Sequence, residues 1–363
     1  MVQVEARAYF STAELEKADS FRSGQLWLYG GRTLVELLVL VAAVRLAPRD
    51  TRRPVVTGAA AAAAITLVST VVALPLRAAS RERAKHVGLV TQSWGGWTVD
   101  VAKGAAIGGV LSGAGGALLV VGMRRFGRDW WAPGAAAVAG FALVFTYLGP
   151  VVLDPVFNKF TPLPAGATRD DVLDLARRAG VSVGEVYEVD ASRRTTAANA
   201  YVTGVGHTKR VVLYDTLLKD FTPAETRLVV AHELGHVRHR DVPQGLLWLA
   251  LVAPFGTLAI ARLAEPLTRP GSSAVPAVAL SLALVAPALT TISNQLSRAV
   301  ERRADAFALE LTGEPDAMVA FERRITIQNV GDPDPPRWQE IVLGTHPPTM
   351  ERIGQALASA RGS

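Results

Sequence analysis

The string His232-Glu-Leu-Gly-His236 is the part of the sequence whose residue types and spacing most clearly indicate chemistry. On a helix, its two histidines lie four residues apart on one face, so both imidazole rings can reach one metal ion. Glu233 then lies about 100° around the helix axis from His232, where its carboxylate can contact a water beside the metal. A zinc ion lowers the pKa of such a water to around 7, and a carboxylate can accept the proton as the water attacks a carbonyl group. The spacing therefore indicates metal-assisted hydrolysis.

A zinc hydrolase needs a third protein ligand and an open coordination position. His239 follows His236 by less than one turn, and we interpret it as a surface side chain. Glu301 is the better third ligand, because it shares a helix face with Asp305 within Ser297-Arg-Ala-Val-Glu-Arg-Arg-Ala-Asp305. One of these carboxylates can bind the ion while the other orients a ligand histidine. The alternative is a solvated acidic pair that is neutralised by the neighbouring arginines.

The segment 154–241 has the pattern of a small α+β unit that could position these residues. One amphipathic helix is expected from Thr168 to Gly180, and short strands are expected at 185–189, 199–203 and 209–214. The last two strands flank a glycine-containing loop at 204–208, which is typical of a hairpin. Thr222-Pro-Ala-Glu225 then predicts a capped helix start with proline in the first turn. This helix runs directly into the two histidines.

Long apolar runs account for much of the remaining chain of 363 residues. Charged residues make up 19% of the sequence, against about 25% in soluble domains, and cysteine is absent, which excludes disorder, disulfide scaffolds and thiolate zinc fingers. Five apolar runs carry no charge, and each approaches the ~20 residues that a membrane helix needs. They are 54–76, 104–123, 130–153, 242–261 and 270–297. A sixth run at 26–46 is mainly apolar but carries Arg32 and Glu36.

The sequence therefore predicts a mainly α, multi-pass helical membrane protein with a small α+β zincin-like catalytic insert. The two spans between His236 and Glu301 must form an antiparallel hairpin for these residues to meet. The expected order begins with an N-terminal amphipathic segment on the membrane surface (1–25) and four transmembrane helices (26–153). The catalytic insert follows (154–241). Two further transmembrane helices (242–297) and a C-terminal helical part that completes the zinc site (298–363) end the order.

The distribution of basic residues indicates where the protein resides. Six spans place both termini and the insert on one side, and that side holds most of the lysines and arginines, which favours the cytoplasm. The strong excess of arginine over lysine indicates a GC-rich bacterial genome, and hence a bacterial plasma membrane. Most of the basic residues lie beside apolar runs, where they suit anionic lipid headgroups. We therefore expect the lipid bilayer as a partner and no nucleic acid.

Several strings together resemble the type I CAAX prenyl protease family of membrane zinc endopeptidases, and more distantly the HtpX-like stress proteases. They lie along most of the chain beyond its first spans. The matching strings are Phe157-Asn-Lys-Phe-Thr-Pro-Leu163, Asn199-Ala-Tyr201, Thr208-Lys-Arg-Val-Val-Leu-Tyr-Asp-Thr-Leu-Leu218, His232-Glu-Leu-Gly-His236, Glu301-Arg-Arg-Ala-Asp305-Ala-Phe-Ala and Thr345-His-Pro-Pro-Thr-Met-Glu-Arg352.

The resemblance implies a role for each of the matching site residues. One Zn²⁺ would be held by His232, His236 and Glu301, with Glu233 as the general base. Asp305 would orient a ligand from behind. His346 would line the catalytic cleft and steady the oxyanion, and Arg352 would line the same cleft. An edge strand that pairs with an extended substrate would carry Asn199, Ala200 and Tyr201.

The resemblance also implies a substrate class, for which two alternatives remain. The substrate would be a peptide or protein with a prenylated or otherwise membrane-tethered C-terminus, from which the last residues are removed. HtpX-like cleavage of misfolded membrane proteins is the alternative within the same chemistry. A rival from another class is a transporter or scaffold with a structural metal, but transporters place ionisable residues within their spans, and these spans carry almost none. Eukaryotic family members have seven spans, one more than we count.

Overall fold

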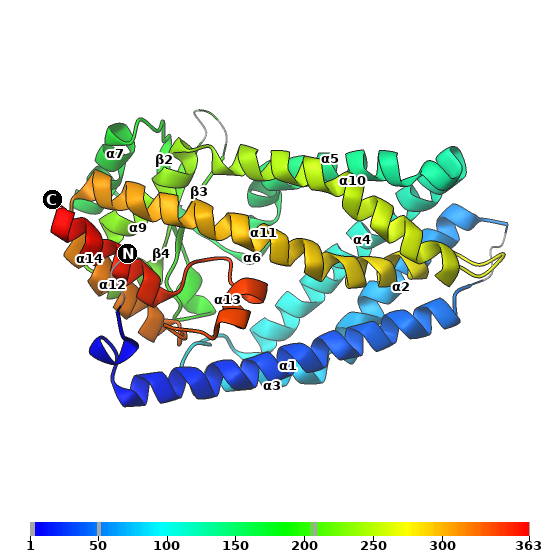
Figure 1. Cartoon of the computed structure of the whole chain (residues 1–363), viewed down its shortest axis with the longest axis horizontal. Coiled ribbons are helices and arrows are strands. Elements are labelled where there is room, and N and C mark those ends of the chain that lie inside the picture. The colour runs from blue at the N-terminus through cyan, green and yellow to red at the C-terminus, as the bar shows by residue number, and fades with distance from the viewer. Residues whose placement is uncertain (1–3, 49–51, 205, 207–208, 363) are drawn as a thin grey trace.

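The computed structural model describes residues 4–48, 52–204, 206 and 209–362 (Figure 1). Six helices among the described residues are long and apolar enough to cross a membrane. They run along the long axis of the molecule, while a small sheet and the shorter helices gather at one end (Figure 1). The prediction of a mainly helical membrane fold is therefore confirmed. The six helices are α1 (Thr12–Arg45), α2 (Pro54–Val72), α4 (Trp94–Phe126), α5 (Trp131–Val152), α10 (Asp241–Leu267) and α11 (Val275–Thr312).

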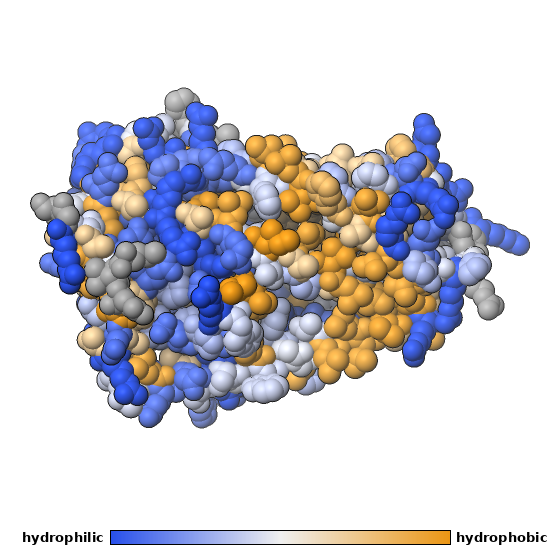
Figure 2. Space-filling model, in the orientation of Figure 1, coloured by the Kyte–Doolittle hydropathy of each residue, from blue (hydrophilic) through white to orange (hydrophobic). Residues whose placement is uncertain are grey.

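The surface reflects this division into a lipid-facing part and a polar end. Figure 2 shows apolar residues gathered over the long helices, with hydrophilic residues over the sheet end and at the opposite tip. Many large apolar side chains on these helices stay exposed, among them Val110, Phe141 and Phe255. In water such a surface would drive aggregation, so it indicates contact with lipid.

Helix α1 differs from the expected N-terminal organisation. It begins after Ser11, which caps it, and continues without interruption across the expected boundary between residues 25 and 26. Ala18 and Phe21 are buried beside Val330, so this part of the helix packs on protein rather than lying flat on the membrane. The amphipathic segment is therefore the first part of a spanning helix.

The sheet has four strands in the order β1-β2-β4-β3. Strands β2 and β4 are parallel, and β3 pairs with β4 as the expected antiparallel hairpin; the loop at 204–208 lies largely outside the described residues. The sequence predicted three strands and missed β1, which is only three residues long and lacks an alternating pattern. The strands are β1 (Phe160–Pro162), β2 (Glu185–Val189), β3 (Ala200–Thr203) and β4 (Arg210–Tyr214).

The shorter helices cover the sheet and close the polar end. Helix α7 (Ala167–Arg178) and helix α9 (Pro223–Arg238) share one core with the sheet, which includes Val186, Val211 and Leu234. The other elements are η1 (Ala6–Ala8), α3 (Leu74–His86), η2 (Gly127–Asp129), α6 (Asp154–Phe157), η3 (Ala191–Arg193), α8 (Asp215–Asp220), α12 (Pro315–Gln328), α13 (Arg337–Leu343) and α14 (Thr349–Gly362).

Helix α9 starts where the sequence predicts. Thr222 Oγ1 accepts a hydrogen bond from the backbone N–H of Glu225 at 3.3 Å, and Glu225 Oε2 accepts one from the Thr222 N–H at 2.7 Å. This capping box satisfies backbone donors that a helix start leaves free. At its other end α9 is joined to α10 through Arg240, whose φ of 58° is left-handed and turns the chain sharply.

Candidate metal centre

Helices α9 and α11 cross closely at the histidine string. An ideal Cβ at Gly235 would lie 3.1 Å from Phe307 Cδ1 and 3.4 Å from the Cα of Ala304, so a side chain there would push the helices apart. The helical hairpin of α10 and α11 returns the chain so that α11 packs against α9, as the sequence requires. Glycine therefore costs some intrinsic helix stability but permits the close approach.

This crossing brings the three expected metal ligands together. One ligand atom from each of His232, His236 and Glu301 lies within 4.8 Å of the other two. The two Nε2 atoms are 3.1 Å apart, His232 Nε2 lies 3.2 Å from Glu301 Oε2, and His236 Nε2 lies 3.7 Å from Glu301 Oε1. Glu301 Oε2 is buried and makes no hydrogen bond of acceptable geometry. Such a converging, partly unsatisfied donor set fits a metal ion.

Each histidine is fixed from behind by a carboxylate. His232 Nδ1 donates to Asp305 Oδ1 at 2.8 Å, and His236 Nδ1 donates to Asp241 Oδ2 at 2.8 Å. A neutral imidazole that donates from Nδ1 carries no hydrogen on Nε2, so each ring can offer that atom to a metal ion at the shared point. The sequence anticipated the carboxylate behind one ring but missed Asp241, which the sharp turn at Arg240 places beneath the second histidine. Its position five residues after His236, at a helix start, was the available signal.

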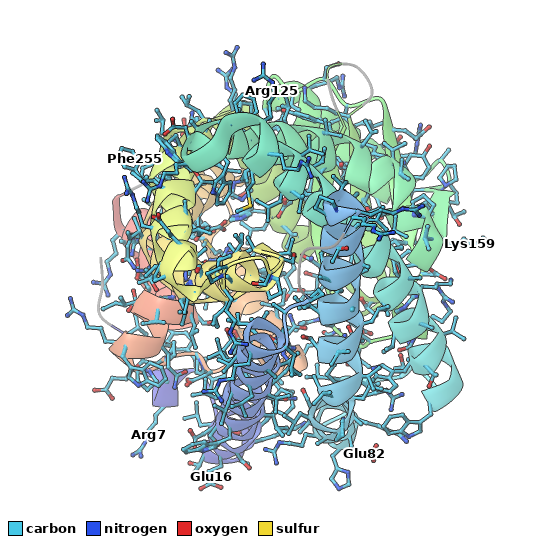
Figure 3. The ribbon with its side chains drawn as sticks, turned by 90° about the vertical axis from the view of Figure 1, so that its right-hand side faces the viewer. Arg7, Glu16, Glu82, Arg125, Lys159 and Phe255 are labelled. Carbon is cyan, nitrogen blue, oxygen red and sulfur yellow. The ribbon has the colours of Figure 1, made fainter. Side chains whose placement is uncertain are left out.

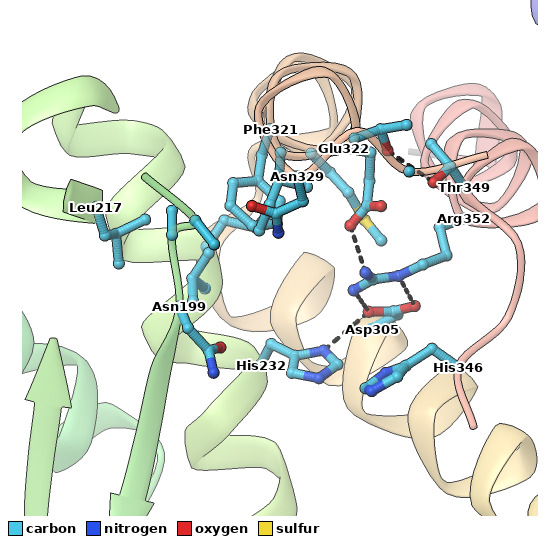
Figure 4. Close-up of a pocket in the computed structure, with 18 of the residues that line it drawn as sticks. Asn199, Leu217, His232, Asp305, Phe321, Glu322, Asn329, His346, Thr349 and Arg352 are labelled. Carbon is cyan, nitrogen blue, oxygen red and sulfur yellow. Dashed lines mark hydrogen bonds and ion pairs between the residues drawn. The ribbon is translucent and has the colours of Figure 1, made fainter. Parts of the chain in front are cut away.

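Asp305 is in turn held by a mostly buried arginine, which also contacts a second acid. Arg352 Nε donates to Asp305 Oδ2 at 2.8 Å, and its Nη1 lies 2.6 Å from Glu322 Oε1 (Figure 4). Glu322 is 2% exposed. Burial raises the pKa of Glu322 to about 7, and the negative charge of Asp305 adds to this rise. The positive charge of Arg352 opposes the rise, but Arg352 is shared between the two carboxylates. No pattern in the sequence indicates a role for Glu322.

A cavity of about 630 Å³ opens beside the ligands, and Glu233 lies on its wall. Burial raises the pKa of Glu233, and the charge of Glu301 adds to the rise, whereas the two ligand histidines lower it. A carboxyl with a raised pKa is a stronger base than one in open water. The cavity has a largely apolar side, with Leu217, Met318 and Phe321 among its lining residues (Figure 4).

His346 and Arg352 approach the site from the C-terminal part of the chain, and both line the cavity. His346 Nδ1 lies 2.9 Å from Glu301 Oε2, and its side chain is 61% exposed. Figure 4 shows the His346 ring beside that of His232, at the end of the cavity opposite Asn199. The imidazole can therefore reach a ligand at the metal point, whereas the guanidinium of Arg352 is committed to two carboxylates.

The three expected strand residues do not all face the cavity. Strand β3 lies at the edge of the sheet, with β4 as its partner among the described strands. Asn199 lines the cavity, whereas Ala200 is buried in the core between sheet and helices. The Tyr201 side chain packs on the opposite face of the sheet, in the cluster that includes Val212. Of the three residues, Asn199 alone therefore lines the cavity.

Comparisons with known proteins agree with this geometry. Residues 162–360 match the model of peptidase family M48, and residues 11–159 match that of the CAAX prenyl protease N-terminal region, described as five membrane helices. Of the described helices in that second range, four are long and apolar enough to span a membrane. Both halves of the chain therefore carry the signature of one family.

Individual relatives support the same assignment. The chain is 31% identical over 303 residues to an uncharacterized metalloprotease, YhfN, of Bacillus subtilis, with 80% of this chain and 71% of that protein covered. It is 32% identical over 222 residues to a CAAX prenyl protease 1 homolog of Oryza sativa, where 58% of this chain and about half of that protein (52%) are covered. The crystal structure of S. mikatae Ste24p has the same fold, with a TM-score of 0.83, 20% identity, and coverage of 98% of this chain and 91% of that one. The chain therefore belongs to peptidase family M48 and is a multi-pass membrane metalloprotease.

Proposed function

We propose that this metalloprotease holds one zinc ion between His232, His236 and Glu301. Zinc bonds of about 2.0–2.1 Å in a tetrahedron place neighbouring ligand atoms roughly 3.3–3.4 Å apart. The two Nε2 atoms are 3.1 Å apart, and they lie 3.2 and 3.7 Å from the Oε2 and Oε1 atoms of Glu301 respectively, which scatters around that value. Two neutral imidazoles and one carboxylate are also a donor set that catalytic zinc uses. This convergence of three donors is the observation that carries the proposal.

The residues around the ion suit hydrolysis of a peptide bond. When bound, zinc supplies Lewis-acid chemistry that polarises a carbonyl group and lowers the pKa of water. Glu233 accepts a proton from the attacking water and passes it to the leaving amine. His346 faces the metal point from the other side of the cavity, where an imidazole N–H can stabilise the negative oxygen that develops in the transition state.

The Glu233→Gln variant tests the assignment of the base. We expect zinc content to stay at one ion per chain while peptide cleavage falls by about 10²- to 10⁴-fold, because only proton transfer is lost. Glu301→Ala should instead lose zinc, measured by plasma emission spectrometry on purified protein. Cleavage by Glu233→Gln at the rate of the unchanged enzyme would remove this residue from the mechanism.

The substrate is proposed to bind as an extended strand along β3. Backbone groups at this edge of the sheet can pair with a peptide, a mode that gives affinity without requiring a particular side chain. Asn199 lies where this edge meets the cavity, so its side chain can contact the peptide beside the scissile bond. Ala200 and Tyr201 contribute through their backbone.

We propose a lipid-modified C-terminal segment as the preferred substrate. The names of the rice relative and of the matched N-terminal region both refer to CAAX prenyl proteases, and the apolar wall of the cavity suits aliphatic residues. Cleavage of one peptide with and without a farnesyl group, in detergent, tests the proposal. A rate at least tenfold higher for the farnesylated peptide is expected. Equal rates would favour the alternative, removal of damaged membrane proteins.

The catalytic end is proposed to face the cytoplasm of a bacterial plasma membrane. Most of the lysines and arginines lie on the side of the sheet and both termini, which the positive-inside rule assigns to the cytoplasm. The short loops at the opposite tip also carry arginines, so the charge difference between the sides is modest.

A further inference from the structure

A second cavity lies between helices α1, α3 and α4, and no residue lines both it and the cavity at the metal centre. Its volume is about 380 Å³. Three arginines line it, one from α1 and two from α3, together with the aromatic side chains of Tyr29 and Trp97. Figure 3 shows α1 and α3 side by side along the lower edge of the molecule, where Glu16 and Glu82 are labelled. The arginines are Arg32, Arg77 and Arg81.

Arg81 is the most unusual of the three because it is buried without a full set of partners. It is 6% exposed, and it donates from Nη2 to the backbone oxygen of Gln92. Its Nε and Nη1 atoms are buried and have no hydrogen-bond partner. The guanidinium carbon lies 4.1 Å from the centre of the Trp94 ring, which holds the cation in place. Its positive charge has no described carboxylate partner and is therefore uncompensated beside the cavity.

The other charges around the cavity also favour an anion. Among the residues that line it, all of which the structure describes, none is a carboxylate. Glu36 pairs with Arg32 at 3.3 Å from outside the cavity wall and offsets one positive charge. Arg77 makes no described side-chain contact with a carboxylate, so at least two cations remain available. The polar pair Gln25 and Ser80 is satisfied internally by a hydrogen bond of 2.5 Å.

The position of the cavity along the bundle fits a lipid headgroup. The apolar helix α2 ends at Val72, and the strongly basic α3 follows almost at once. Tyr29 and Trp97 line the cavity and Trp94 stacks on Arg81, and such aromatic side chains are enriched where lipid tails meet headgroups. Arginines at this depth can reach a phosphate from the side of the acyl chains.

We propose that this cavity binds the phosphate of an anionic phospholipid headgroup, with Arg77 as its principal ligand and the buried Arg81 as a second positive charge beside it. The Arg77 guanidinium group donates charge-assisted hydrogen bonds to the phosphate oxygens. Phosphatidylglycerol suits the site because its headgroup adds no positive charge. The choline group of phosphatidylcholine would be repelled by the same arginines.

Binding of short-chain lipids to the full chain in detergent tests the proposal. Dioctanoyl phosphatidylglycerol, dioctanoyl phosphatidylcholine and inorganic phosphate are titrated separately, and the bound fraction is measured by native mass spectrometry. Phosphatidylglycerol should bind about tenfold more tightly than phosphatidylcholine. Equal affinities would overturn the proposal. So would displacement of phosphatidylglycerol by equimolar inorganic phosphate, because the site would then accept free phosphate.

Variants separate this site from general attraction to a basic surface. Arg77→Gln should weaken phosphatidylglycerol binding by about tenfold, since one charge-assisted contact is lost. Arg262→Gln is the matched control, because Arg262 is an exposed arginine on α10 outside this cavity. It should change the affinity less than twofold. Equal losses in both variants would overturn the proposal. The variant Arg81→Gln would not separate lipid binding from folding, because loss of its contacts to Trp94 and Gln92 can impair folding.

Discussion

At the scale of single residues, the metal centre depends on side chains that bind no metal themselves. Asp305 and Asp241 fix the two imidazole rings, and each is held by an arginine, Arg352 and Arg303 respectively. The convergence of His232, His236 and Glu301 could be predicted from the sequence, because spacing on a helix determines which side chains share a face. The contacts of Asp241 and Glu322 could not, because they depend on how α9 meets α10 and how α12 packs behind α14.

Loss of the carboxylate behind His236 should weaken the metal site without removing a ligand. We expect Asp241→Asn to reduce metal affinity by about 10- to 100-fold, as is usual for a residue that orients a ligand. Competition with a chromophoric chelator measures the affinity. Asp316→Asn, an exposed aspartate on α12, serves as the control and should bind metal as the unchanged protein does. An unaltered affinity in Asp241→Asn would contradict this role.

Glu322 makes stability depend on pH in a defined direction. Its pKa is raised to about 7 in the folded protein, against about 4.3 in an unfolded chain. Between these two values the folded state holds a proton that the unfolded state has released, so this group makes the fold less stable as pH rises from about 4.3 to 7. The Tm of Glu322→Gln relative to the unchanged protein should therefore increase over that range, measured by thermal unfolding in detergent.

A matched control variant shows whether Glu322 causes this change of the Tm difference with pH. Glu310→Gln changes an exposed glutamate on α11, and its Tm difference should stay flat with pH. A flat difference for Glu322→Gln as well would show that Glu322 is already ionised throughout this range. Comparison of the two variants at each pH removes the contribution of every other titrating group.

At the scale of elements, prediction succeeded where local chemistry determines the structure. The capping box at Thr222 defines the start of α9, and the apolar runs locate the long helices. It failed where packing decides, as in the missed strand β1 and the continuous helix α1. The expected boundary between residues 297 and 298 also falls within α11, because no helix-breaking residue separates its membrane part from Glu301.

The crossing of α9 and α11 should tolerate no side chain at Gly235. The added methyl of Gly235→Ala would lie 3.1 Å from Phe307 Cδ1 and in ordinary contact with the Ala304 backbone, so the Phe307 ring must shift by a few tenths of an ångström. We expect metal affinity and peptide cleavage both to fall at least tenfold, although alanine is the better helix former. Gly245→Ala on α10 is the control, since an added Cβ there meets nothing within 4 Å. An active Gly235→Ala variant would show that the two helices can accommodate the added methyl group.

At the scale of the whole molecule, the long helices connect two polar ends of different composition. One end holds the sheet, the metal centre and the described residues nearest both termini, and the other holds short loops (Figures 1 and 2). The sequence predicted this division from alternating apolar and polar segments. It could not place the chain with certainty in one orientation, because arginines occur at both ends.

The absence of cysteine from the sequence allows a direct test of orientation. Single variants Glu310→Cys at the catalytic end and Arg125→Cys at the opposite end are both at exposed positions. In intact cells a membrane-impermeant maleimide should label Arg125→Cys, and Glu310→Cys only after the cells are permeabilised. The reverse pattern would place the metal centre outside the cytoplasm.

The division of the ligand set between α9 and α11 has a consequence for biosynthesis. Glu301 follows His236 by 65 residues in the sequence, with a membrane hairpin between them. A ribosome that has completed only the histidine string has produced a chain with two of its three ligands. The nascent chain therefore cannot complete the proposed metal site until α11 has been synthesised, so the site can form only after both helices of the hairpin exist.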